Sequence, residues 1–204
     1  MRKTAVRDNG SAAFSGTCSE SSQRKSVRLA NTSGSMRVHL EVPSLRREPE
    51  FLVAVRQSRS LHGQLASPPR TRQQYRAYLD RIAGSTHLGY FVCLSSGELA
   101  GVINVNEIVR GRFRSGYLGY YVLAPHAAKG YMAQGLRLVI SRAFRRDRLH
   151  RLEANVQPGN VRSLALVRGL GFRLEGLSLR YLKIGGQWRD HERWALTVED
   201  WKNR

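Results

Sequence analysis

A change of periodicity near residue 125 constrains the fold more than any other feature of the sequence. Before it, segments either alternate apolar and polar side chains, as 36–42 does, or form short apolar runs separated by turn residues. Both patterns are typical of strands that pair as antiparallel hairpins. From 131 to 147 apolar residues recur every three or four positions, which predicts a long helix. A sheet that begins with hairpins and is then interrupted by helices indicates a mixed α/β fold.

Turn and capping residues divide the chain into elements. Pro49 suits the first turn of a helix, and Thr71 with Gln74 forms a capping box. Gly171 suits a helix end, and the glycines at 185–186 suit the tight turn of a hairpin. We expect strands at 36–42, 89–94, 99–106, 115–123, 151–156, 172–184 and 188–197, and helices at 48–60, from 71, at 131–147 and at 160–170.

The length of 204 residues fits one domain with an extension. Residues 1–34 are rich in polar side chains and lack periodicity, so we expect a disordered N-terminal extension before a single domain at 35–204. Hydrophobic residues make up 41% of the chain, but no run approaches the ~18 apolar residues of a membrane span. Cys18 and Cys93 show neither metal-ligand nor disulfide spacing. We therefore expect a cytoplasmic protein with no metal and no membrane contact.

The chain is strongly basic, with 34 Lys and Arg against 15 Asp and Glu and a net charge of +19. A field of this size favours a polyanionic partner such as nucleic acid, a ribonucleoprotein or a phosphate-rich cofactor. The basic residues are spread along the chain, however, and none of their runs exceeds two residues. Solvated arginines on ordinary surfaces therefore explain the charge equally well, and both interpretations stay open.

The junction between the strand ending near 123 and the long helix is the most informative local feature. Unpaired N–H groups and the helix dipole make a helix start a seat for phosphate. Gly130 lets the backbone approach an anion closely, and Lys129 adds a charge. The small residues Ala127 and Ala128 keep the rim open. The glycine spacing does not fit the P-loop of nucleoside-triphosphate enzymes.

Three motifs in the same order resemble those of one family. Residues 127–132, Ala-Ala-Lys-Gly-Tyr-Met, resemble the acetyl-CoA signature Arg/Gln-x-x-Gly-x-Gly/Ala of the GNAT N-acetyltransferase superfamily, from which the first and last residues depart. The Asn-x-x-Ser, Leu-Gly-Phe and Glu-Gly groups within 160–176 resemble the run that follows in that superfamily. The segment 181–191 is similar to the C-terminal hairpin of RimJ/RimL-type ribosomal-protein N-terminal acetyltransferases. The resemblance covers about residues 36–201.

This resemblance implies a mostly antiparallel sheet that is flanked by helices and splayed where acetyl-CoA binds. It implies that Val122 and Leu123 offer backbone groups to the pantetheine arm. Asn160 would hydrogen-bond the same arm and also cap its helix. By the same resemblance, the pyrophosphate is held by backbone N–H groups of Ala127, Ala128, Lys129, Gly130, Tyr131 and Met132.

Three residues are candidates for catalysis under the resemblance. Glu153 lies on the strand face that would meet the thioester and is our first candidate for the general base; the alternative is a glutamate paired only with Arg151. Glu107 ends the neighbouring predicted strand and is the second candidate, or it could bind the incoming ammonium. Ser163 could reach the thiolate leaving group or complete the helix cap.

The expected reaction is direct transfer of an acetyl group from acetyl-CoA to a primary amine, which the resemblance places at the N-terminal alanine of a ribosomal protein. An α-amino group has a pKa of about 8, against about 10.4 for lysine, so a modest base suffices near neutral pH. Two alternatives stay open. The acceptor could be a small amine or an antibiotic, or the fold could serve a non-catalytic ribosome- or RNA-binding protein. Contact with ribosomal RNA is suggested by the charge alone and stays open with the two interpretations of that charge.

Overall fold

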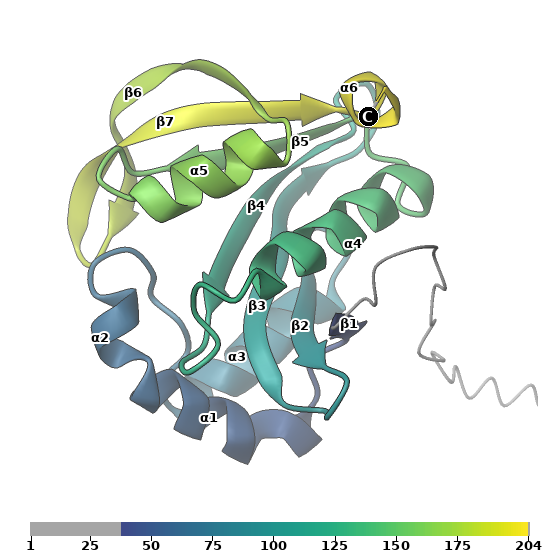
Figure 1. Ribbon diagram of the computed structural model, residues 1–204. Helices are drawn as coiled ribbons and strands as arrows, with labels where there is room; N and C mark the ends of the chain where they lie inside the picture. The colour runs from purple at the N-terminus through teal and green to yellow at the C-terminus, as the bar shows by residue number, and fades with distance from the viewer. Residues whose placement is uncertain (1–37, 204) are drawn as a thin grey trace, which may run out of the picture.

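The computed structural model describes residues 38–203, and the expected extension at 1–34 lies outside them. The described residues form a seven-stranded sheet with the strand order β1-β2-β3-β4-β5-β7-β6 (Figure 1), which confirms the mixed α/β class. The strands are β1 Val38–Glu41, β2 Leu88–Leu94, β3 Leu99–Val109, β4 Ser115–Val122, β5 Arg151–Val156, β6 Arg173–Ile184 and β7 Gln187–Thr197. The helices are η1 Leu45–Arg47, α1 Glu48–Gln57, α2 Arg59–His62, α3 Arg72–Ala83, α4 Tyr131–Arg145, α5 Val161–Gly169 and α6 Val198–Lys202.

Helices cover both faces of the sheet (Figure 1). On the face that we call the α4 face, a large hydrophobic cluster includes Leu136 and Ile140 of α4 and Leu152 of β5. On the opposite face, the α1 face, a smaller cluster includes Phe51 of α1 and Phe91 of β2. Within residues 38–203 the helices are too short or too polar to cross a membrane.

Most local signals read from the sequence are confirmed. Thr71 Oγ1 accepts the Gln74 N–H at 3.2 Å, although the Gln74 side chain accepts from the Arg70 N–H, so only half of the expected capping box forms. Gly171, which directly follows the last turn of α5, has φ +84°, a left-handed backbone that favours glycine. The glycines at 185–186 also have positive φ and join β6 to β7.

Three features differ from the prediction, and one of them is η1, which the sequence analysis did not expect. The expected helix 48–60 breaks at Ser58, whose hydroxyl donates to Ala54 O at 2.6 Å and accepts from the Ala124 N–H at 2.8 Å. This side chain anchors the helix to a loop that is distant in sequence, and α2 begins afresh after it. The sequence interpretation also missed α6, which starts with a reciprocal capping box between Thr197 and Asp200.

The fork between β4 and β5 is the feature that positions the site. These two strands run parallel, and their ladder joins 115–118 only to 151–154. β4 then continues to Val122 and β5 to Val156 without pairing to each other. The register therefore defines a fork whose arms are residues 119–122 and 155–156, as the diverging ribbons show (Figure 1).

Candidate active site

Along the fork, β4 has backbone N–H and C=O groups that are not paired with a neighbouring strand. Leu123 N–H donates to Ala100 O at 2.8 Å, and its carbonyl accepts from His126 N–H at 2.9 Å. Because backbone groups alternate in direction along a strand, those of Val122 face the fork. The Val122 carbonyl already accepts a hydrogen bond from His62 Nε2 at 2.8 Å. Of the two predicted pantetheine contacts, Leu123 has both groups engaged, whereas Val122 keeps its N–H turned to the fork.

The first turn of α4 has the features of an anion seat. Gly130 is its N-cap residue, with φ +76°, and no side chain caps the N–H groups that follow. A Cβ at Gly130 would meet no atom within 4 Å, so the space above this backbone is open. Ala128 also adopts positive φ, and Lys129 is exposed beside it. The loop therefore fits a pyrophosphate held by backbone N–H groups at the start of a 15-residue helix.

The two departures from the acetyl-CoA signature lie at the ends of this loop. The Met132 side chain is buried and packs over Gly101 of β3, where an added Cβ would overlap the sulfur. It therefore turns into the sheet and leaves the loop rim clear. Near Ala127, His126 is buried with its Nδ1 atom lacking a hydrogen-bond partner among the described residues. The Tyr131 ring lies 6.0 Å from the His126 ring.

A pair of hydroxyl groups bridges β4 and α5 on the α4 face of the fork. Tyr120, on the unpaired arm of β4, lies 2.5 Å from Ser163 Oγ on the first turn of α5. Burial raises the pKa of the Tyr120 phenol to about 12, so it remains protonated at neutral pH. Asn160 caps α5 by accepting the Ser163 N–H at 3.2 Å, which confirms the predicted cap. The sequence interpretation gave Tyr120 no role, because nothing local indicates that it faces Ser163.

Glu153 lies on the α1 face of β5 and pairs with Tyr117 of β4. This pair comes directly before the last β4–β5 pair, beyond which the fork opens. The Glu153 carboxylate accepts a hydrogen bond from Arg151 Nε at 2.8 Å, and its side chain is 17% exposed. The terminal nitrogens of Arg151 also hold Glu175, and these hydrogen bonds lower the pKa of Glu175 to about 2. The pairing with Arg151 that the sequence analysis gave as the alternative is therefore present, at a position next to the fork.

Glu107 is not brought to the fork. It lies at a bulge in β3 between Asn106 and Val109, with φ +48°. Its side chain is 71% exposed and contacts His87 Nε2 at 3.4 Å. Since Asn106 pairs with Tyr117, Glu107 lies toward the closed end of the β4–β5 ladder. The geometry therefore favours Glu153 over Glu107 as the carboxylate nearer the reacting groups.

Asn155 is a further candidate, which lies two residues after Glu153 and on the same face of β5. It is the first residue of β5 beyond the last pair with β4, and it lies opposite Arg193 of β7. Its Oδ1 atom is buried and has no hydrogen-bond partner among the described residues. An unpaired buried carbonyl oxygen has a free energy cost unless a ligand or water satisfies it. Alternation along the strand predicts this face, but only the fold reveals the unpaired oxygen.

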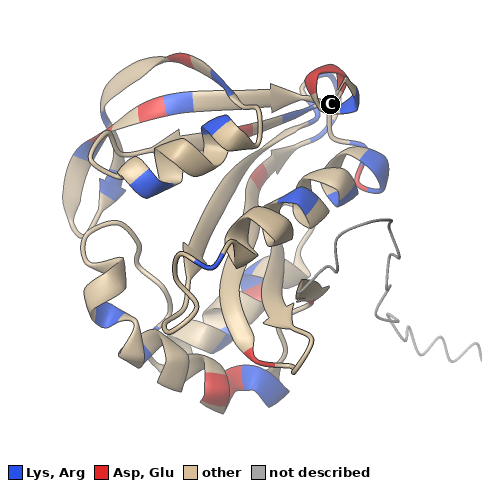
Figure 2. Ribbon diagram, in the orientation of Figure 1, with Lys and Arg blue, Asp and Glu red and all other residues tan. Residues whose placement is uncertain are grey.

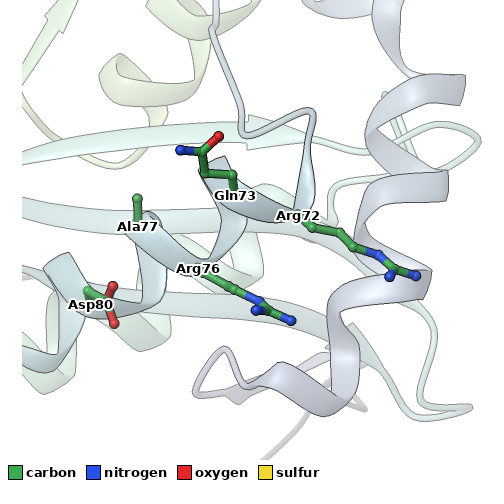
Figure 3. Close-up of a pocket in the computed structure, with 5 residues that line it drawn as sticks. All are labelled: Arg72, Gln73, Arg76, Ala77 and Asp80. Carbon is green, nitrogen blue, oxygen red and sulfur yellow. The ribbon is translucent and has the colours of Figure 1, made fainter.

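Two other features are separate from the fork. A shallow hollow of about 440 Å³ lies along α3, lined by Arg72, Gln73, Arg76, Ala77 and Asp80 (Figure 3). Both of its arginines share the single carboxylate of Glu48, at 3.3 and 3.7 Å. The second feature groups His39, Glu41 and Cys93 closely enough to share a cation. The Arg47 guanidinium lies among them, 3.2 Å from Glu41 and 3.3 Å from the Cys93 sulfur.

The fork, the uncapped start of α4 and the capped start of α5 define an acyltransferase of the GNAT class. The family model described as "Acetyltransferase (GNAT) domain" matches residues 37–173. The chain belongs to this family, which confirms the resemblance seen in the sequence, and it is an acetyl-CoA-dependent acyltransferase.

Relatives and solved structures agree with this assignment. The chain is 34% identical over 131 residues to "Probable N-acetyltransferase YjcK" of Bacillus subtilis, covering 63% of this chain and 72% of that protein. It is 44% identical over 104 residues to the "[Ribosomal protein uS5]-alanine N-acetyltransferase" of Escherichia coli, covering 51% of this chain and about half, 54%, of that protein. The structure of "Mycobacterium smegmatis RimJ in complex with CoA-disulfide" superposes with a TM-score of 0.73 at 27% identity, covering 80% and 83% of the two chains.

Proposed function

We propose that acetyl-CoA binds in the β4–β5 fork and that the enzyme acetylates the N-terminal amine of a protein, with the N-terminal alanine of a ribosomal protein as its preferred acceptor. The observation that carries the proposal is the fork itself, which opens beside the uncapped N-terminus of α4. Donor groups line its α4 face and a carboxylate lies on its α1 face. When bound, acetyl-CoA supplies the activated acetyl group.

The residues around the fork would divide the binding between them. The N–H of Val122 faces the fork and would donate to an amide of the pantetheine arm. The N–H groups at 130–132 would hold the pyrophosphate, and Lys129 would add a favourable charge. Asn160 uses its side-chain oxygen as a cap and would offer its amide N–H group to the same arm.

The residues on the two faces would divide the proton transfers. Glu153 would take a proton from the acceptor ammonium, directly or through a water molecule, and Asn155 Oδ1 would accept from the amine N–H. On the α4 face, the Ser163 and Tyr120 hydroxyls would relay a second proton to the thiolate leaving group. The attacking nitrogen loses this proton as the amide forms, so that both hydroxyls end protonated and CoA leaves as its thiol. Burial raises the pKa of Tyr120 to about 12, so at neutral pH the phenol is protonated and serves as a hydrogen-bond donor in this pair.

The choice of acceptor rests on the E. coli relative, whose printed name specifies the alanine of ribosomal protein uS5. A protein N-terminus also suits a single ion-paired carboxylate, because the amine is already partly neutral near pH 7. A small amine remains the competing acceptor, which the experiment below includes.

The test is acetyl transfer by purified enzyme, with products identified by mass spectrometry. A peptide beginning with alanine should gain one acetyl group on its α-amine, whereas the same peptide with a blocked N-terminus and an internal lysine should not react. In cells, one ribosomal-protein N-terminus should lose its acetyl group when the gene is deleted. Faster transfer to spermidine or to an aminoglycoside than to any alanine peptide would overturn the acceptor assignment.

A further inference from the structure

Two segments that are separate in the sequence lie together at the closed end of the β4–β5 ladder. One is the turn 110–114 between β3 and β4, and the other is the loop 145–150 between α4 and β5. Arg110 of the turn donates from its guanidinium to Asp147 O at 2.8 Å. The backbone N–H of His150 donates to Arg114 O at 2.6 Å. The two segments therefore form one continuous surface.

This surface is rich in arginine. The turn and the loop carry six exposed arginines, which we call the arginine patch: Arg110, Arg112, Arg114, Arg145, Arg146 and Arg148. Figure 2 shows the basic colour over the last turn of α4 and the loop after it.

Few carboxylates oppose this charge, and Glu107, three residues before the turn, contacts His87 at 3.4 Å. Asp147 is half-buried within the patch and interacts with Arg110 and Arg146. The nearest carboxylate of α6, Glu199, contacts His150 at 3.1 Å. Among the described residues, no ion pair or hydrogen bond engages the side chains of Arg112 and Arg145. The fold thus brings together on one surface positive charges that belong to two distant segments of the sequence.

An aromatic side chain lies within the arginine patch. Phe113, between two of the arginines, is 74% exposed, and Val109 just before the turn is 46% exposed. A large apolar ring held in water among guanidinium groups has no structural role in the hydrophobic clusters of the described chain. Aromatic rings flanked by cations are the arrangement on which unpaired nucleic-acid bases stack while phosphates contact the arginines.

We propose that the arginine patch with Phe113 is a binding surface for an unpaired RNA segment. Arginine side chains bind phosphate oxygens through a planar fork of donors, and Phe113 would stack on one base. The use of arginine rather than lysine and the single exposed ring favour RNA over an anionic membrane, which needs an amphipathic apolar face to insert.

The patch is spatially distinct from the proposed catalytic fork. It surrounds the first residues of β4 and β5, whereas the fork lies at their far ends. The six residue steps from Arg114 to Tyr120 span roughly 20 Å at about 3.3 Å each. RNA bound at the patch would therefore leave the fork accessible, and the proposal holds whatever the acceptor amine is.

The test measures fluorescence anisotropy of a labelled, unstructured oligoribonucleotide of about 15 nucleotides with the full chain. The wild type should bind with an affinity that falls as salt rises. The double variant Arg112→Ala/Arg145→Ala should reduce the slope of log K against log salt by about 1.4, since each lost phosphate contact on a single strand contributes about 0.7. Phe113→Ala should weaken binding at least about fivefold, because it removes a stacking surface.

Arg56→Ala/Arg59→Ala is the matched control, since it removes two exposed charges from α1 and α2. It should retain most of the affinity. Equal weakening by the patch and control variants would overturn the proposal, because the charge would then act diffusely. No RNA binding by the wild type, or tighter patch-dependent binding to phosphatidylserine vesicles than to RNA, would also overturn it. All variants should acetylate a short peptide at the wild-type rate, which separates this proposal from the proposed enzyme activity.

Discussion

Glu153 forms an ion pair with Arg151 and lies beside the fork. A mutation can separate its hydrogen bond to Arg151 from its proposed role as proton acceptor. Glu153→Gln keeps the shape and the hydrogen bond to Arg151 but removes the proton acceptor. We expect turnover to fall by about 10²-fold, the low end for a general base, because the amine is already partly neutral. The affinity for CoA, measured by titration calorimetry, should not change. Glu107→Gln is the control and should retain full turnover; a loss there with none at Glu153 would move the base to Glu107.

A substitution at Gly130 tests the phosphate seat. Gly130 has φ +76°, so any side chain there adds backbone strain of about 1–3 kcal/mol, and a strain control is needed. Gly111, with φ +71° and equally open space, provides a strain control in the turn between β3 and β4, at the opposite end of β4 from the loop.

We therefore expect Gly130→Val and Gly111→Val to lower the free energy of unfolding by similar amounts. Only Gly130→Val should weaken CoA binding, by about 1.4 kcal/mol or more, which is tenfold in Kd. Urea denaturation and calorimetry measure the two effects. Equal CoA affinity in both variants would argue against the seat at residues 130–132.

At the scale of elements, α2 is tied to β4 by a buried histidine. His62 donates from Nε2 to Val122 O at the edge of the fork, and its ring packs against Tyr121 at 5.2 Å. Burial lowers the pKa of His62 below its usual 6.5. The unfolded chain therefore binds this proton at a higher pH than the folded chain does, and folding stability falls as the pH drops below about 6.5.

His62→Gln should flatten this part of the pH dependence. The free energy of unfolding, measured by urea at about pH 7.5 and 5.5, should differ less between the two pH values than in the wild type. The acidic groups with lowered pKa values, such as Glu175, lose their contribution only at lower pH. His39→Gln, at an exposed site on β1, should retain the wild-type difference. If His62→Gln retains it too, the histidine does not carry the pH dependence.

Local signals predicted most elements because caps and turns act over a few residues. The hairpin glycines, the Thr71 and Asn160 caps and the α4 periodicity all form as expected. The errors come from contacts that join distant segments. Ser58 ends α1 because it binds the loop at Ala124, and nothing within 48–60 indicates that partner.

At the scale of the whole molecule, the sequence predicted candidate site residues more readily than it predicted which of them lie together. Family motifs led to Asn160, Ser163 and the loop 127–132, all of which border the fork. The motifs did not reveal the Tyr120–Ser163 contact, because it depends on where β4 stops pairing with β5. The arginine patch was hidden for the same reason: its two segments are about 30 residues apart and meet only through the β4–β5 register.

The short β4–β5 ladder has a mechanical consequence. The strands β1 to β4 and the strands β5, β7 and β6 form two plates of a sheet, joined through four residue pairs. A ligand bound along both arms of the fork would connect β4 and β5 where the two strands form no backbone hydrogen bonds with each other. Binding in the fork would then stiffen the seam between the plates, so that the catalytic groups on its two sides would keep a fixed separation while the ligand is present.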